Sequence, residues 1–360
     1  MEKAMIYAYT ANNLGDDLFI YILCKRYPNT QFHLYAPESY KKTFSSIPNL
    51  KIIVNDDFKH KMLHQLSKMI GKRYLFRERH AKKCPIGVYV GGSLFMETTN
   101  WKNDVKNLRS MIDSHENLFI LGANFGPFKT EAFWQAYEQL FKNVTDICFR
   151  DRASFELFHH LRNVRHASDI AFQLKPVRSL SHDNSVLLSV IYPSVRKDLR
   201  DFDTIYFHKM KTIAISFIEQ GYDVKFMAFC EKEKDGEAIE EIVRIIPDSY
   251  RSNLSTYIYR NDIEEALETF MKSKAVIATR FHAMLLGWIF EKPVFPIIYS
   301  NKMKTVMDEA GFEGHFCEVK NIGELNIDHV MKTPYMKPIH IEKQTLDSNE
   351  QFLKLDQFLN

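Results

Sequence analysis

The chain has few cysteines, and their placement excludes two common kinds of small scaffold. The 360 residues contain five cysteines, an odd number, and none of them forms a Cys-x-x-Cys pair. Disulfide frameworks and structural zinc sites both need paired or closely spaced cysteines. We therefore expect neither, and the five thiols stand singly at Cys24, Cys84, Cys148, Cys230 and Cys317.

The sequence also has little excess of one sign of charge and few long apolar runs. The formal net charge is only +3, so the composition carries no strong nucleic-acid signal. The apolar run at 283–290 is far too short to span a membrane, and residues 1–10 lack the layout of a signal peptide. We expect a cytosolic protein without a nucleic-acid partner.

What the sequence does contain is a regular alternation of short apolar runs and amphipathic stretches, which predicts parallel sheets with helices on both faces. In the first half, strands are expected over 4–10, 32–35, 52–54, 86–90, 118–121 and 146–149, and helices over 16–27, 62–70, 104–114 and 131–141. In the second half, strands are expected over 185–191, 223–229, 257–259, 275–279 and 294–297, and helices over 202–219, 235–246, 263–271 and 302–310.

The pattern predicts an α/β protein of two Rossmann-like domains with a cleft between them. The first domain covers 1–176 and the second 184–333, because the polar segment 174–184 lacks periodicity and has the composition of a linker. A helix expected over 348–358 would pack back on the first domain.

The most informative segment is 278–290, which predicts the end of a buried strand, a turn and the start of a helix. Open α/β sheets bind ligands at such strand ends, and a helix N-terminus favours an anion. Arg280 adds a planar guanidinium that fits carboxylate or phosphate oxygens. His282 adds a group that can move a proton near neutral pH, although a histidine satisfied at a domain interface explains it equally well.

Four further turns follow predicted strands. In the first, Gly15 permits a tight turn and close ligand approach, Asp16 is a good helix N-cap, and Asn13 could donate to a substrate hydroxyl. A capped helix start without a ligand is the alternative. In the second, Gly91 and Gly92, followed by Ser93, expose backbone N–H groups that can bind an anion; a plain tight turn is the alternative.

The remaining two turns add an amide and a cation, and a loop after a later strand adds a second cation. The segment 121–127 carries Asn124 between two glycines, which indicates a loop that lies close to another group. Arg150 follows the next strand and could clamp an anion, or it could pair with a local aspartate. Lys302 follows the strand after Arg280 and could reach the same rim, or it could be a solvated lysine.

Together these five turns resemble the polysaccharide pyruvyl transferase family. The matching motifs are Asn13-Leu-Gly-Asp16, Gly91-Gly-Ser-Leu94, Gly122 with Gly126-Pro127, Arg150-Asp-Arg152 with Ser154, and Arg280-Phe-His282. They occur in the family's order over about residues 10–302. The sequence departs from the family's frequent triple glycine, because position 90 is Val.

The resemblance implies a GT-B-like arrangement of the two domains, with the acceptor on the first and the donor on the second. It implies phosphoenolpyruvate as donor, a saccharide as acceptor, and a cyclic pyruvate ketal in bacterial surface polysaccharide as product, with no cofactor and no metal. Arg280, Lys302 and Arg150 suit an anionic donor. His282 and Asp16 are the candidates for the proton donor and the hydroxyl base.

Two other function classes remain open. The first is a GT-B-like glycosyltransferase that uses a nucleotide sugar, for which Glu291 is a weak candidate ribose-binding residue. The second is a non-catalytic sugar- or anion-binding protein.

A basic stretch at 72–83 has two interpretations. It could attract an anionic membrane surface or a lipid-linked acceptor, which would place the protein at the inner face of the membrane. It could also be a solvated loop.

Overall fold

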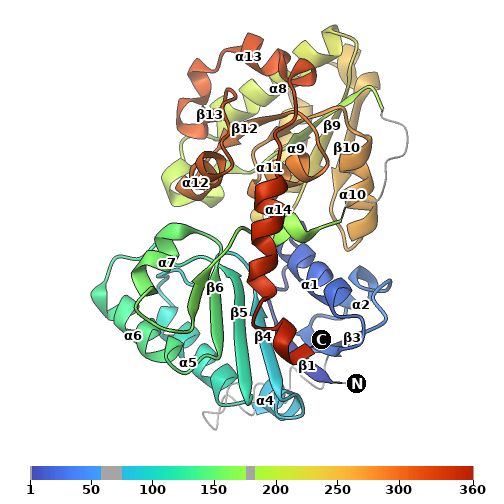
Figure 1. Ribbon diagram of the computed structural model, residues 1–360. Coiled ribbons are helices and arrows are strands. Elements are labelled where there is room, and N and C mark those ends of the chain that lie inside the picture. The colour runs from blue at the N-terminus through green and yellow to red at the C-terminus, as the bar shows by residue number, and fades with distance from the viewer. Residues whose placement is uncertain (1, 58–74, 176–182, 360) are drawn as a thin grey trace. The chain divides into compact units, whose positions relative to one another are not determined.

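The computed structural model describes residues 2–57, 75–175 and 183–359, and these form two compact units. Unit 1 comprises Met1–Thr10, Asp16–Gln173 and Gln344–Asn360, and unit 2 comprises Ala11–Gly15 and Leu174–Lys343. Each unit holds one parallel sheet, as Figure 1 shows. The chain therefore has the expected α/β architecture of two Rossmann-like units.

The sheet of unit 1 has the strand order β3-β2-β1-β4-β5-β6-β7, and every pairing is parallel. The strands are β1 (Lys3–Tyr7), β2 (Gln31–Ala36), β3 (Leu50–Val54), β4 (Ile86–Val90), β5 (Asn117–Ala123), β6 (Asp146–Phe149) and β7 (Val164–His166). The helices that precede its C-terminal segment are α1 (Leu14–Arg26), α2 (Tyr40–Thr43), α4 (Leu75–Ala81), α5 (Trp101–Ile112), α6 (Glu131–Phe141) and α7 (Arg152–Phe158).

An aromatic core lies between this sheet and the helices α5, α6 and α7. Phe95, Phe125 and Phe141 are buried there, with ring centroids 5.1–6.2 Å apart. Strands buried on both faces need near-continuous apolar sequence, and β6 is buried at all four positions. The sequence pattern missed α7, which starts because the Asp151 carboxylate accepts the Ser154 N–H at 2.8 Å.

Unit 2 holds the second sheet, in the order β10-β9-β8-β11-β12-β13. Its strands are β8 (Ser185–Ser189), β9 (Asp223–Ala228), β10 (Leu254–Ile258), β11 (Ala275–Ala278), β12 (Val294–Ile298) and β13 (Cys317–Glu318). Its helices are α8 (Asp203–Glu219), α9 (Asp235–Arg244), α10 (Ile263–Lys272), α11 (Phe281–Ile289), α12 (Asn301–Glu309) and α13 (Ile327–Met331). All pairings are parallel, and α8 buries an apolar face in the core.

The C-terminal segment differs from the single helix expected over 348–358. Helix α14 (Glu342–Ser348) ends where that helix should begin, and a 3-10 turn (Asn349–Phe352) and the short helix α15 (Asp356–Leu359) follow. Gln351 explains the break, because its buried amide accepts from Gly122 N at 2.9 Å and donates to Ala167 O at 2.8 Å. These bonds tie the segment to unit 1 in a form that a continuous helix would not match.

Two further expectations are a helix over 62–70 and an apolar run too short to span a membrane. The helix expected over 62–70 lies outside the described residues. Among the helices that the structure does describe, none is long and apolar enough to cross a membrane.

Candidate active site

The topology of unit 2 defines where a ligand should bind. From β8 the strand order runs outward in two directions, through β9 to β10 on one side and through β11 to β13 on the other. Ligands in open α/β sheets bind outside the carboxyl ends of the strands at the point where the order reverses. In unit 2 that point lies between β8 and β11, and Arg280 lies two residues after the end of β11.

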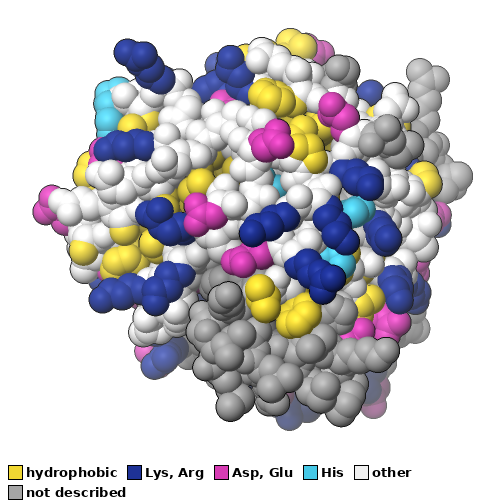
Figure 2. Space-filling model, turned by 90° about the horizontal axis from the view of Figure 1, so that it is seen from below, with side chains coloured by type: hydrophobic (Ala, Val, Ile, Leu, Met, Phe, Trp, Pro, Cys, Tyr) yellow, Lys and Arg dark blue, Asp and Glu magenta, His cyan; other side chains and the backbone are white. Residues whose placement is uncertain are grey.

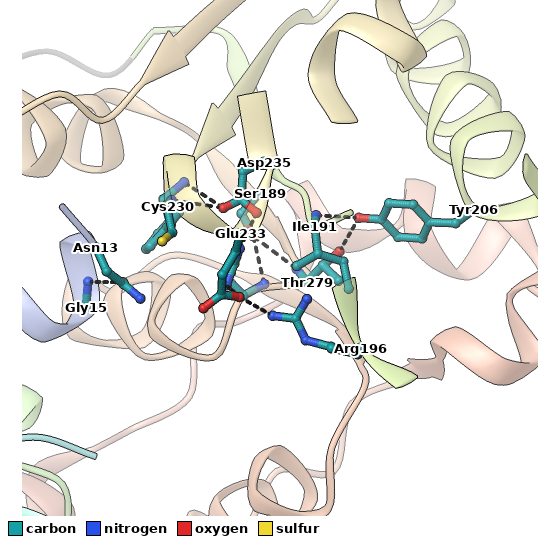
Figure 3. A network of polar contacts seen from close by, with 12 residues as sticks. Asn13, Gly15, Ser189, Ile191, Arg196, Tyr206, Cys230, Glu233, Asp235 and Thr279 are labelled. Carbon is teal, nitrogen blue, oxygen red and sulfur yellow. Dashed lines mark hydrogen bonds and ion pairs between the residues drawn. The ribbon is translucent and has the colours of Figure 1, made fainter. Parts of the chain in front are cut away.

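The turn after β11 is fixed by buried hydroxyl groups. The Ser189 hydroxyl, at the end of β8, accepts from the backbone N–H groups of Thr279 at 3.0 Å and Arg280 at 3.1 Å. The hydroxyls of Tyr206 and Thr279 lie 2.9 Å apart, and the Tyr206 oxygen also accepts from Ile191 N. Figure 3 shows this network. It places Arg280 at the N-cap of α11 with little freedom.

The Arg280 side chain is only 7% exposed and is held by two carboxylates. Its Nη1 donates to Glu233 Oε2 at 2.5 Å, and its Nη2 pairs with Asp235. Arg196, which follows β8, donates to the same Glu233 oxygen at 2.5 Å. Two guanidinium groups from different loops therefore lie side by side on one carboxylate.

Asp235 is itself locked in place at the start of α9. Its second oxygen accepts from the backbone N–H groups of Phe229 and Cys230, each at 3.0 Å. Lys234 before it adopts a left-handed backbone conformation with φ of 62°. The loop after β9 is thus built to present Glu233 and Asp235 toward Arg280.

Tyr299, directly after β12, and Lys302, in the first turn of α12, complete the surroundings of the two arginines. The Arg196 guanidinium lies 4.4 Å from the ring centroid of Tyr299, and Lys302 Nζ lies 5.2 Å from the ring centroid of Phe281. Three cations and two carboxylates thus gather at the carboxyl ends of β8, β9, β11 and β12. Their charges leave a net positive site, which suits an anionic ligand.

Burial and the neighbouring charges shift the pKa values of this cluster in opposing directions. Burial raises the pKa of Glu233, but Arg280 and Arg196 lower it by more, so the net shift of the pKa is downward. Burial lowers the pKa of Arg280, but Asp235 and Glu233 hold it well above its ordinary value. Burial raises the pKa of Asp235, and Arg280 opposes that rise only in part.

Tyr299 responds to the same charges. Burial raises its pKa, but Lys302, Arg196 and Arg280 stabilise the phenolate and lower the pKa below its ordinary value overall. A tyrosine whose proton is released more easily than usual is a second proton-transfer candidate beside His282.

The segment Ala11–Gly15 packs with unit 2, although it lies within the 1–176 region expected to form the first domain. Asn13 forms an isolated bridge with Cys230, and Leu14 N donates to Phe229 O at 3.1 Å. Gly15 lies against His282, where an added Cβ would come within 1.9 Å of the imidazole Nδ1. Only glycine leaves room for the ring in this place.

The role expected of Asp16 as a helix cap belongs to Asn13 instead. Helix α1 begins at Leu14, two residues earlier than expected, and the Asn13 side chain accepts from Gly15 N at 3.0 Å. Asp16 lies half-buried in the first turn of α1. Helix α1 starts earlier because Asn13 is held in the bridge with Cys230, a contact between distant residues that the local sequence cannot show.

The glycine turn of unit 1 surrounds a buried arginine. Arg150 donates to Asp169 at 2.7 Å and to Asn124 Oδ1 at 2.8 Å. Asn124 N donates to Gly92 O at 2.8 Å, and the Ser93 hydroxyl lies 3.4 Å from Asn124 Oδ1. A Cβ on Gly92 would lie 2.5 Å from the Arg150 guanidinium. Arg150 therefore stabilises this turn. It pairs with an aspartate, which was one of the two interpretations that the sequence allowed.

The expected site residues thus form two groups. Unit 2 brings together Asn13, Gly15, Arg280, His282 and Lys302. Unit 1 brings together Gly91, Gly92, Ser93, Asn124 and Arg150, and Asp16 also belongs to unit 1.

Sequence reasoning missed five residues of these groups. They are Asp169 in unit 1 and Arg196, Glu233, Asp235 and Tyr299 in unit 2. The four in unit 2 follow strands β8, β9 and β12. Ligands in open α/β sheets bind at the carboxyl ends of strands, so a search of the residues after every predicted strand would have found them.

The basic stretch lies only partly within the described residues. Lys72, Arg73 and Tyr74 fall outside them, and Arg77 on α4 donates to Asn107 at 2.6 Å on α5. On the face in Figure 2, basic side chains lie among acidic and apolar ones. Membrane contact therefore stays a prediction.

A family model decides the assignment. The model described as polysaccharide pyruvyl transferase matches residues 10–301, most of the chain. The chain belongs to the polysaccharide pyruvyl transferase family. The match spans the turns at Asn13, Gly91, Asn124, Arg150 and Arg280, so both groups of site residues lie within the family region.

A curated relative agrees with membership of the pyruvyl transferase family. The chain is 22% identical over 260 residues to the amylovoran biosynthesis protein AmsJ of Erwinia amylovora. The alignment covers 65% of this chain and 61% of AmsJ. The chain thus matches somewhat less than two thirds of the relative's length.

Solved structures show that this pyruvyl transferase family member has the GT-B fold. HepE of Anabaena in complex with UDP and glucose is similar at a TM-score of 0.58 and 12% identity, over 100% of this chain and 99% of that one. The UDP-GlcNAc 2-epimerase of Methanocaldococcus jannaschii gives 0.61 at 11% identity, over 99% and 100%. The ADP-heptose heptosyltransferase II of E. coli gives 0.52 at 12% identity, over 99% and 100%.

Among the described residues, no group of three or more histidine, cysteine, aspartate or glutamate side chains is placed to hold a metal ion.

Proposed function

We propose that this pyruvyl transferase family member moves the pyruvyl group of phosphoenolpyruvate onto two hydroxyls of a saccharide. The product is a cyclic pyruvate ketal, and the pathway is bacterial surface polysaccharide synthesis. Family membership supports a transferase acting on polysaccharide, and the similarity to an amylovoran biosynthesis protein supports the pathway.

The observation that carries the proposal is the net positive cluster at the switch point of unit 2. Arg196, Arg280 and Lys302 surround Glu233 and Asp235 there. Phosphoenolpyruvate carries a phosphate and a carboxylate, and guanidinium groups bind both kinds of anion through paired hydrogen bonds. A site of this charge at this position fits such a donor.

The reaction needs one proton added to carbon and two removed from hydroxyls. Protonation of the methylene carbon of phosphoenolpyruvate makes C2 electrophilic and oxocarbenium-like. One sugar hydroxyl forms a C–O bond to C2 and loses its proton. The C2–O bond to phosphate then breaks, and the second hydroxyl bonds to C2 and loses its proton. The departing phosphate takes up the remaining proton and leaves as inorganic phosphate. We assign the donor to the second domain, which holds the net positive cluster, and the acceptor to the first.

We assign His282 to one of these proton transfers. It stands two residues after Arg280, and Gly15 confines its ring. Asp16 is the second candidate, because it follows Gly15 in the chain. In unit 1, the contacts of Arg150 with Asn124 and Asp169 suit a residue that shapes the glycine turn for the acceptor.

The test compares two donors. The protein is incubated with phosphoenolpyruvate and a galactoside, and in parallel with a UDP-sugar and the same acceptor. We expect phosphate release that depends on the acceptor, and a product heavier by pyruvate minus water. UDP release without phosphate release would instead favour a glycosyltransferase, and binding without turnover would favour a sugar- or anion-binding protein.

Two variants separate binding from turnover. Arg280→Ala should abolish donor binding, and His282→Ala should mainly lower kcat. Removing Arg280 also leaves Asp235 buried without its partner, which destabilises a protein by about 3–5 kcal/mol, so circular dichroism must show that the variant folds. Arg244→Ala is the control, because that arginine is also in unit 2 and its side chain is 73% exposed. Normal turnover in His282→Ala would remove the histidine from the mechanism.

A further inference from the structure

Arg196 is a residue that neither the motifs nor the family resemblance singles out, yet it stands beside Arg280. It follows a 3-10 turn (Pro193–Val195) after β8. Its Nη2 and the Nη1 of Arg280 each lie 2.5 Å from the same oxygen of Glu233. Since like charges repel, a carboxylate that accepts from both holds the two guanidinium groups together.

The cluster leaves two buried guanidinium nitrogens without a hydrogen-bond partner, Arg196 Nη1 and Arg280 Nε. The hydroxyl of Ser300, which follows Tyr299 in the chain, is also buried without one. Buried N–H groups are nearly always hydrogen-bonded, and an unsatisfied one costs about 1–3 kcal/mol. A purely structural ion-pair cluster would satisfy its own donors, so these atoms indicate a site that accepts an external oxygen-rich group.

Tyr299 fixes the orientation of Arg196. The guanidinium carbon lies 4.4 Å from the centre of its ring. A guanidinium that lies over an aromatic face keeps its in-plane N–H groups for hydrogen bonds. The Arg196 side chain is also 20% exposed, whereas that of Arg280 is 7% exposed. The Arg196 side chain is thus more exposed to solvent than that of its neighbour.

We propose that Arg196 and Arg280 form a paired-guanidinium site for the phosphate of the donor, with Glu233 as the positioning residue that holds the pair. The ligand class is a phosphate monoester dianion, and Ser300 supplies a hydroxyl to it. The assignment of the phosphate to a transferred donor rests on the proposed function. Phosphate binding itself does not.

The test uses the full-length protein and inorganic phosphate as the probe. Isothermal titration calorimetry measures phosphate affinity for the wild type, Arg196→Met and Arg196→Lys, and kinetics measure KM and kcat with phosphoenolpyruvate. Arg244→Met is the matched control, because that arginine is also in unit 2, pairs with one glutamate and is 73% exposed.

We expect Arg196→Met to weaken phosphate binding at least tenfold and to raise KM for phosphoenolpyruvate more than it lowers kcat. Arg196→Lys should recover only part of the loss, because an ammonium lacks the planar fork. Arg244→Met should match the wild type. If Arg196→Met fails to fold, the lysine variant decides.

Three results would overturn the inference. They are a wild type that binds no phosphate, an Arg196→Met variant with unchanged phosphate affinity, and a lysine variant equal to the wild type. Phosphate binding that depends on Arg196 without release of phosphate from phosphoenolpyruvate would uphold this site and reject the proposed function.

Discussion

At the residue scale, the sharpest constraint is the contact between Gly15 and His282. The two residues are 267 positions apart in the sequence, yet the imidazole occupies the space that a side chain at position 15 would need. In the sequence, Gly15 looks like a residue that permits a tight turn. In the structure, it makes room for a side chain that is distant in the chain. The orientation of the candidate proton donor depends on it.

We expect Gly15→Ala to lower kcat at least tenfold, because a methyl group 1.9 Å from Nδ1 would force the His282 ring to move. Gly236→Ala is the matched control, since its nearest neighbour would be 3.7 Å away. Steady-state kinetics and thermal unfolding measure both variants. Equal kcat values in the two variants would show that Gly15 does not position the histidine.

The lowered pKa of Tyr299 gives a second prediction at this scale. Burial alone would raise that pKa, and Lys302, Arg196 and Arg280 lower it. Arg196→Met removes one of these cations, so the phenol should ionise at higher pH in that variant. Ultraviolet absorbance during a pH titration, with Tyr299→Phe as the reference, measures the shift. A shift to lower pH would contradict this electrostatic account.

At the element scale, the C-terminal segment shows tertiary contacts overriding a helical pattern. Apolar spacing predicts one helix over 348–358, but the buried Gln351 side chain takes backbone partners from β5 and from the loop after β7. Phe352 and Phe358 pack on Tyr27 and Phe119 with ring centroids 6.2 and 5.2 Å apart. These contacts need a turn within the segment.

Gln351→Ala should therefore destabilise the protein by about 2–3 kcal/mol, since it leaves several buried backbone groups without their partner. Gln357→Ala is the control, because Gln357 is exposed on α15. Urea unfolding followed by circular dichroism compares the two. A loss below about 0.5 kcal/mol in Gln351→Ala would mean that the amide is not a structural tie.

At the scale of the whole molecule, the chain crosses between its two units more often than a simple two-domain order requires. Residues 11–15 join unit 2 from within the first half, and Gln344–Asn360 return to unit 1. Unit 1 is thus built from three separate pieces of sequence, and the last of them is hydrogen-bonded to the second.

This organisation predicts how fragments behave. A chain of residues 1–173 should be less stable than the same chain joined by a short Gly/Ser linker to 344–360, because the first exposes Phe119 and the backbone partners of Gln351. Thermal melts of the two fragments measure the difference. Equal melting temperatures would show that the C-terminal segment is dispensable for unit 1.

The sequence alone determined much of this protein. Alternating apolar and amphipathic stretches define the strands and helices, because both periodicities are local. Short motifs at strand ends indicated the family and some residues of each group, Arg280 in unit 2 and Arg150 in unit 1 among them, since parallel strands bring their carboxyl ends to one edge. Arg280 stood out for that reason.

Only the tertiary structure decided which partners meet. Local patterns carry no information about which distant residue fills a given space or shares a given charge. The fold therefore decided that Gly15 makes room for His282, that Arg150 is held by Asp169, and that Glu233 joins Arg196 to Arg280. These pairings depend on strand order and loop packing, which are properties of the whole chain.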